Sequence, residues 1–135
     1  MAELTVTADD NNLEAVQDFI REQIGLTCEN VKTLMQIDLA IEEIFVNIAH
    51  YAYTDGGDVT IKCDFSDESH ILTVVFLDSG KQFDPLAKPD PDVTAGAEDR
   101  GIGGLGIFLT KKYMDNVKYS YTDGKNVLTI EKTLD

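Results

Sequence analysis

The chain has 135 residues, of which 43% are hydrophobic and 27% are charged, and its formal net charge is −14. This length is typical of one folded unit, so we expect a single domain over residues 1–135. A surface this acidic repels polyphosphate backbones and anionic membranes, which argues against nucleic acid and membranes as partners. A basic protein partner is compatible with the charge, and so is a role in solubility alone.

Neither a membrane anchor nor an export signal is predicted. No run of about 18 apolar residues occurs, and the first residues lack a basic region followed by an apolar one. Cys28 and Cys63 form no Cys-x-x-Cys pair and have no histidine cluster beside them. We therefore expect free thiols in a reducing compartment rather than a zinc site, and a cytoplasmic protein.

The first half of the chain predicts a strand followed by two helices. Residues 4–7 form a short candidate strand, and the polar residues 9–12 supply helix caps. Apolar residues then recur at helical spacing until Gly25, which predicts a helix over about 13–24. A longer helix is predicted over about 28–52. Its main apolar stripe consists of Leu34, Ile37, Ile41, Ile44, Ile48 and Ala52.

The second half predicts the rest of a sheet. Residues 59–65 alternate as a half-buried strand does, and the apolar run 71–77 is typical of a central strand. Residues 84–100 show no periodicity and contain all three prolines, which predicts a lid, with a plain surface loop as the alternative. A glycine-rich stretch leads into a helix, and residues 117–133 predict a closing hairpin. The fold class is therefore α+β, a two-layer sandwich with helices covering one face of a mixed, mostly antiparallel sheet.

The long helix carries a narrow polar lane opposite its apolar stripe. At 100° per residue the lane consists of Gln36, Glu43, Asn47 and His50. Two interpretations stay open, a solvated face or a polar strip that a ligand satisfies, and the apolar flanks of the lane favour the second. Beside a nucleotide, a glutamate can act as a general base, and the carbonyl oxygen of an asparagine suits Mg²⁺.

Two further segments have the chemistry of a nucleotide site. Asp78-Ser79-Gly80 follows the central strand, where a carboxylate can accept a hydrogen bond from an exocyclic amine and a glycine lets a ring approach. The run from Arg100 to Gly106 offers bare backbone N–H groups before a helix, which suits an anion. Its Gly-x-Gly-x-x-Gly pattern follows a proline-bearing loop rather than a strand, so we reject a Rossmann fold, and no P-loop motif occurs.

Together these segments resemble the motifs of GHKL ATPases. Glu43-x-x-x-Asn47 is similar to the N box of that family, and Asp78-Ser-Gly-Lys-Gln-Phe-Asp-Pro85 is similar to its first glycine box. Gly103-Gly-Leu-Gly-Ile-Phe-Leu109 resembles the second glycine box. The phrase through Phe-Asp-Pro resembles the branch of bacterial anti-sigma-factor serine kinases. The resemblance covers nearly the whole chain, with three motifs in the family's order.

The resemblance implies roles for individual residues. Glu43 would be the catalytic base, Asn47 the Mg²⁺ ligand, and Asp78 the acceptor for the adenine amine. The loop from Arg100 to Gly106 would cover the phosphates, and Thr129 would support the adenine contact. The set implied to bind ATP is Asn47, Asp78, Gly80, Arg100, Gly101, Gly103, Gly104, Leu105, Gly106 and Thr129. His50 lies one place earlier than the corresponding histidine of the kinase branch, so no role is carried onto it.

The function implied by the resemblance is that of a stand-alone serine/threonine protein kinase that uses ATP and Mg²⁺. Its partners would be a sigma factor, which it holds inactive, and a small antagonist protein, which it phosphorylates, and it would form a homodimer. A nucleotide-dependent binding module without kinase turnover is the main alternative, and retention of Glu43 argues against it. A sensor histidine-kinase catalytic domain is a third hypothesis, which lacks a phospho-acceptor hairpin before the first predicted strand.

Overall fold

An antiparallel sheet is the framework of the computed structural model, which describes residues 1–25, 30–87 and 104–134. Its strands lie in the order β1-β2-β3-β5-β4. The bounds are Ala2–Thr7 for β1, Asp58–Phe65 for β2, Ile71–Asp78 for β3, Asn116–Thr122 for β4 and Lys125–Thr133 for β5. Every described strand pair is antiparallel rather than mixed. The predicted α+β sandwich is confirmed.

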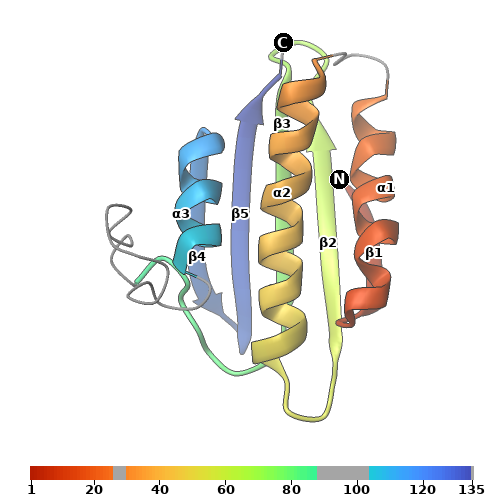
Figure 1. Ribbon diagram of the computed structural model, residues 1–135. Coiled ribbons are helices and arrows are strands. Elements are labelled where there is room, and N and C mark those ends of the chain that lie inside the picture. The colour runs from red at the N-terminus through yellow and green to blue at the C-terminus, as the bar shows by residue number, and fades with distance from the viewer. Residues whose placement is uncertain (26–29, 88–103, 135) are drawn as a thin grey trace.

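Three helices lie on one face of this sheet (Figure 1). They are α1 at Leu13–Ile24, α2 at Val31–Asn47 and α3 at Gly104–Tyr113. A short 3₁₀ turn, η1, precedes α1 at Asp10–Asn12, and a π-helical turn, η2, continues α2 over Ile48–Ala52. None of the described helices is long and apolar enough to cross a membrane.

Local sequence signals set the helix ends. Asn30 caps α2 by accepting a hydrogen bond from the backbone N–H of Thr33. The chain leaves α1 at Gly25, whose φ of 62° suits a residue without a Cβ. Within the described part of the helix predicted over 28–52, the chain is α-helical from Val31 to Asn47 and finishes as a π turn. Such turns are rare and often lie at functional sites.

Strand alternation builds the core between the layers. The buried residues of β3 are Leu72, Val74, Phe76 and Asp78, and those of β5 include Asn126, Leu128 and Ile130. They pack against the buried stripe of α2, formed by Ile37, Ile41, Ile44 and Phe45. Because alternate side chains share a face, Asp78 and Asn126 point toward the helices at the ends of neighbouring strands.

Candidate functional site

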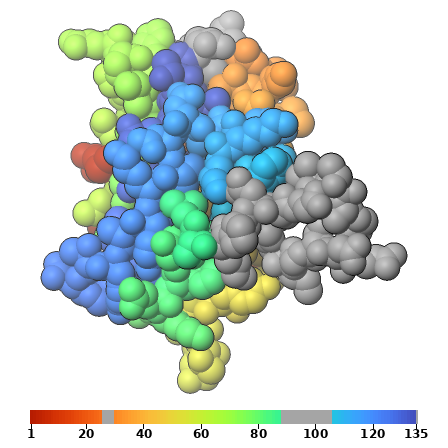
Figure 2. Space-filling view, turned by 90° about the vertical axis from the view of Figure 1, so that its left-hand side faces the viewer, coloured from red at the N-terminus to blue at the C-terminus, as the bar shows by residue number. Residues whose placement is uncertain are grey.

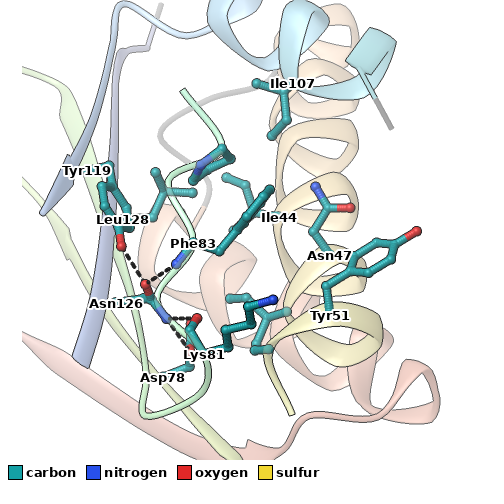
Figure 3. Close-up of a pocket in the computed structure, with 13 residues that line it drawn as sticks. Ile44, Asn47, Tyr51, Asp78, Lys81, Phe83, Ile107, Tyr119, Asn126 and Leu128 are labelled. Atoms are coloured by element: carbon teal, nitrogen blue, oxygen red, sulfur yellow. Dashed lines mark hydrogen bonds between the residues drawn. The ribbon is translucent and has the colours of Figure 1, made fainter. Parts of the chain in front are cut away.

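A cavity lies where α2, the end of β3, the β4–β5 hairpin and the start of α3 meet (Figure 3). The empty space inside it, part of which is open to solvent, is about 460 Å³. Its lining residues are Ile44, Asn47, Ile48, Tyr51, Ala52, Asp78, Lys81, Phe83, Pro85, Ile107, Tyr119, Asn126 and Leu128. Most of the wall is apolar, with a few polar groups that can orient a ligand.

The carboxylate of Asp78 lies at one end of this cavity and is 5% exposed. Its Oδ1 accepts hydrogen bonds from the Gly80 backbone N–H at 3.0 Å and from Asn126 Nδ2 at 2.9 Å. Its Oδ2 has no hydrogen-bond donor among residues 1–25, 30–87 and 104–134. One buried acceptor is therefore held in place, and the other is available to a ligand.

The side-chain amide of Asn126 ties this end of the cavity together. Nδ2 donates to Asp78 Oδ1 and to the Lys81 carbonyl, both at 2.9 Å. Oδ1 accepts from the Phe83 backbone N–H at 3.1 Å and from the Tyr119 hydroxyl. Asn126 is 6% exposed. A buried amide with four partners fixes the segment that follows β3, which lies on the surface beside β4 (Figure 2).

Gly80 lies directly against the π turn η2. A Cβ added to Gly80 would be 2.1 Å from the Ala52 carbonyl oxygen, and the neighbouring Lys81 N–H donates to that oxygen at 2.8 Å. The sequence suggested that this glycine lets a nucleotide ring approach the backbone. In the structure, its lack of a Cβ is needed for backbone-to-backbone packing, which joins the segment after β3 to the end of α2.

The residues of the polar lane of α2 differ in whether they line the cavity. Asn47 lines it and donates from Nδ2 to Glu43 Oε1 at 3.2 Å. Glu43 lies one turn earlier, in a neighbouring groove between α2 and α3. Its carboxylate is so close to α3 that a Cβ on Gly106 would be 2.0 Å from it. His50 instead pairs with Asp10 at 2.7 Å and does not line the cavity.

The half-buried position of Glu43 changes its acidity. Desolvation raises the pKa of this carboxyl, the hydrogen bond from Asn47 partly opposes the rise, and the charge of Glu42 adds to it. A carboxyl with a raised pKa is a stronger base when ionised. Glu43 is therefore suited to accept a proton.

The remaining predicted residues fall into two groups. Arg100, Gly101 and Gly103 lie outside the described residues, as does most of the lid predicted over 84–100. Gly104, Leu105 and Gly106 belong to the first turn of α3, so this end of the glycine run is helix rather than loop.

Thr129 does not have the position that the resemblance implied. It lies opposite Val75 on β5, between the buried Leu128 and Ile130, so it points to the sheet face away from the helices. Thr129 does not line the cavity, and the described hydrogen bonds of the Asp78 side chain go to other residues. Asn126, opposite Asp78 in the same register, makes one of these hydrogen bonds. Counting back by twos from the apolar Leu128 and Ile130 would have placed Asn126 on the core face.

Sequence reasoning also missed several residues that line the cavity. Lys81 is the only Lys or Arg among the described lining residues, and it extends into the cavity from the segment after β3 (Figure 3). Phe83, Tyr119 and Ile107 add apolar surface. The sequence gives no periodic signal for residues in irregular segments. Only the position of Lys81 inside the Asp-Ser-Gly-Lys motif could have identified it.

This arrangement defines the ATP-binding fold of histidine kinases, with a cavity between an antiparallel sheet and the helices on its face. Residues 6–132 match the model of the histidine kinase-like ATPase domain. The chain belongs to that family, which confirms the resemblance found in the sequence. A histidine kinase domain from the Erythrobacter litoralis EL346 blue-light activated histidine kinase has the same fold, with a TM-score of 0.55 and 14% identity over 96% of this chain and 62% of that one.

Curated relatives are serine kinases. The serine-protein kinase RsbW of Listeria monocytogenes serovar 1/2a is 30% identical over 113 residues, which are 81% of this chain and 70% of RsbW. The serine/threonine-protein kinase BtrW of Bordetella bronchiseptica is 27% identical over 94 residues, which are 70% of this chain and 66% of BtrW. These matches support the serine-kinase branch of the family that the sequence indicated.

We expect Gly80→Ala to disturb both the fold and the site. The added Cβ would clash with backbone that cannot move aside as a side chain can, and such overpacking typically costs about 1–3 kcal/mol. Denaturant unfolding should show the loss, and calorimetry should show weaker ATP binding. Ser79→Ala is the matched control because Ser79 is exposed and its side chain makes no hydrogen bond to a described residue. Wild-type stability in Gly80→Ala would contradict the tight packing of Gly80 on Ala52.

Proposed function

We propose that this protein is an ATP-dependent serine/threonine protein kinase that acts as an anti-sigma factor and phosphorylates a small antagonist protein. The observation that carries the proposal is the position of Asp78, a buried carboxylate with one open oxygen at the end of an apolar cavity. At the other end of that cavity Asn47 joins Glu43 beside the first turn of α3. A base-recognition group and a phosphate-handling group thus share one site.

Adenine is the base that suits the Asp78 end. Its exocyclic amine is a donor, which the open Oδ2 can accept, whereas guanine presents a carbonyl oxygen at the same position. Ile44, Phe83 and Leu128 supply apolar walls for the ring. A hydrogen bond to a charged group is worth about 1.5–3 kcal/mol, which is enough to make the site selective for adenine over guanine.

The α3 end suits the phosphates. Helix α3 begins at Gly104, and Ile107 in its first two turns lines the cavity. The N-terminus of a helix carries free N–H groups and partial positive charge, which favours an anion. Lys81 adds a cation to the wall of a protein whose formal net charge is −14. These features supply the local attraction that an acidic protein needs to bind a polyphosphate.

Asn47 fits the requirements of Mg²⁺. Its Nδ2 is used by Glu43, and its carbonyl oxygen accepts no hydrogen bond from residues that the structure describes. An oxygen ligand from one side chain, together with substrate phosphates and water, is a common coordination for this ion. When bound, Mg²⁺ neutralises charge that develops on the transferred phosphoryl group.

Glu43 is proposed as the base for the incoming hydroxyl. It lies one helical turn from Asn47, beside the groove between α2 and α3, where a protein substrate can reach it. The raised pKa strengthens it as a proton acceptor. The proton of the serine or threonine hydroxyl passes to the Glu43 carboxylate as the oxygen attacks the γ-phosphorus, and ADP leaves.

Partners and setting belong to the same proposal. Relatives that are serine kinases support protein phosphorylation as the reaction. The GHKL kinase branch then suggests a sigma factor as the sequestered partner, a small antagonist protein as the substrate, a homodimer as the active form and the cytoplasm as the location. Residues 1–135 would form one domain that carries both functions.

The second candidate is a nucleotide-dependent binding module that does not turn over. One observation favours it: Glu43 lies outside the main cavity, held by Asn47 and covered by Gly106. A carboxylate held in this way could be purely structural. The kinase proposal requires instead that it contact the hydroxyl of a protein substrate.

Phosphate transfer is the direct test of the proposal. The wild-type protein is incubated with γ-labelled ATP, Mg²⁺ and the antagonist-like proteins encoded beside its gene, and we expect label on a serine or threonine of one of them. Binding of ATP without transfer to any of these proteins would favour the binding module. Equal affinity for ATP and GTP in calorimetry would refute the assignment of adenine to Asp78.

We expect Asn47→Ala to abolish Mg²⁺-dependent ATP binding and to leave the fold intact. The change removes the oxygen ligand and, among the residues that the structure describes, a single side-chain hydrogen bond, to Glu43. Calorimetry with ATP, with and without Mg²⁺, measures the effect, and a thermal melt checks the fold. Gln36→Ala is the control, because Gln36 belongs to the same lane of α2 but does not line the cavity. If Mg²⁺ strengthens ATP binding as much in the variant as in the wild type, Asn47 is not a ligand of the metal.

We expect Glu43→Gln to slow phosphate transfer by about 10²-fold or more, the usual scale for a general base. ATP affinity should stay near normal because a base acts mainly in the transition state. The melting temperature at neutral pH should be unchanged or higher, since the variant removes a charge that burial disfavours. In the wild type, the rate of phosphate transfer should decrease at acid pH because Glu43 becomes protonated. Since the pKa of Glu43 is raised, this decrease should begin at a higher pH than the titration of a free glutamate would give.

The control for this variant is Glu42→Gln, which changes an exposed neighbour of the same chemistry. Sigma-factor binding should survive in both variants because it depends on the nucleotide-loaded shape. Transfer at the wild-type rate in Glu43→Gln would exclude Glu43 as the base while leaving the kinase proposal standing.

A further inference from the structure

We propose that Asn126 is the positioning residue that makes the cavity selective for a nucleobase with an exocyclic amine. The inference rests on the proposed ATP site and adds to it the residue that fixes how Asp78 meets the base. Asn126 would not touch the nucleotide. It would act by holding one oxygen of Asp78 as an acceptor and leaving the other toward the cavity.

The orientation of the Asn126 amide is set by backbone groups. The Lys81 carbonyl can only accept a hydrogen bond, so the amide NH₂ must face it, at 2.9 Å. The Phe83 backbone N–H can only donate, so the amide oxygen must face it, at 3.1 Å. A flipped amide would place acceptor against acceptor and donor against donor. The orientation is therefore fixed independently of Asp78.

The fixed amide then determines which oxygen of Asp78 accepts hydrogen bonds from the protein. The second hydrogen of Nδ2 points to Asp78 Oδ1, which also accepts from the Gly80 backbone N–H. Two donors converge on Oδ1, so this oxygen is an acceptor and holds no proton. Oδ2 remains for the ligand, and an amine, which donates, suits it better than a carbonyl oxygen, which cannot.

None of the titratable groups that the structure describes around Asp78 donates a hydrogen bond to its Oδ2. The Tyr119 hydroxyl donates to Asn126 Oδ1, and the Tyr53 hydroxyl accepts from the Ser79 backbone N–H and donates to the Asp58 carbonyl. Burial raises the pKa of both phenols, so both stay neutral at physiological pH. Lys81 lines the cavity as a cation, and the charge of Asp84 is near Tyr119.

Two substitutions separate positioning from simple structural support. Asn126→Ala removes the whole network. Asn126→Asp keeps the shape but replaces Nδ2 by an oxygen, which would face Asp78 Oδ1 and the Lys81 carbonyl at the 2.9 Å distances of the present bonds. That oxygen can be accommodated only by taking up a proton, because two carboxylates this close cannot both stay ionised.

The experiment measures the dissociation constants of ATP and ITP by calorimetry between pH 6 and 8. ITP differs from ATP in presenting a carbonyl oxygen in place of the amine. The wild type should prefer ATP by about 10-fold or more, as expected for one hydrogen bond to a charged group. Asn126→Ala should bring the ratio of the two constants close to 1, because ATP binding should weaken more than ITP binding. Asn126→Asp should bind ATP weakly at pH 8 and recover at pH 6.

Asn116→Asp is the matched control, since Asn116 lies on β4 and its side chain contacts only Glu131 among the described residues. It should keep the wild-type ratio at every pH. If Asn126→Ala weakens ATP and ITP equally, or Asn126→Asp shows no recovery at low pH, the inference is overturned and the ATP site stands. If the wild type binds neither nucleotide, the proposed function fails and the inference fails with it.

Discussion

The hydrogen bond between Asp78 and Asn126 is the interaction on which the rest of the site depends. Strand alternation directs both side chains into the space between sheet and helices, where an unpaired carboxylate or amide would cost a large part of the protein's stability. The amide of Asn126 pairs with one oxygen of Asp78 and also binds the backbone of Lys81 and Phe83. The chain after β3 is thereby folded back over the sheet, and it becomes one wall of the cavity.

Two glycines allow close packing beside that network. Gly80 lets the segment after β3 lie on Ala52, and Gly106 lets α3 lie on Glu43. In both places a Cβ would be about 2 Å from its neighbour, so the glycines of these motifs act through close packing as well as through any contact with a ligand. The π turn η2 contributes the carbonyl of Ala52 to this packing. Close packing at Gly80 thus shapes the cavity, and close packing at Gly106 shapes the neighbouring groove between α2 and α3.

The fold and much of the site could be predicted because their signals are local. Hydrophobic periodicity identified the strands and helices, and Glu43, Asn47, Asp78 and Gly80 belong to short motifs of chemical meaning. Thr129 lies on the sheet face away from the cavity, and its alternation with the buried Leu128 and Ile130 could have indicated this from the sequence. The same alternation could have placed Asn126 on the core face, but it could not have identified the hydrogen-bond partners of Asn126, which are 43 to 48 residues earlier in the chain apart from Tyr119. Arg100, Gly101 and Gly103 stay predictions.

The energetics of Glu43 bear on the choice between a kinase and a pure binding module. Because burial raises its pKa in the folded protein, folding favours the protonated form, and stability falls as the pH rises through this range. At neutral pH the ionised carboxylate is therefore a cost to folding, and a glutamine could accept the hydrogen bond of Asn47 without that cost. A module that only holds a partner gains nothing from the charge. A phosphotransferase gains a base next to the attacking hydroxyl, and perturbed carboxyls of this kind are typical of catalytic sites.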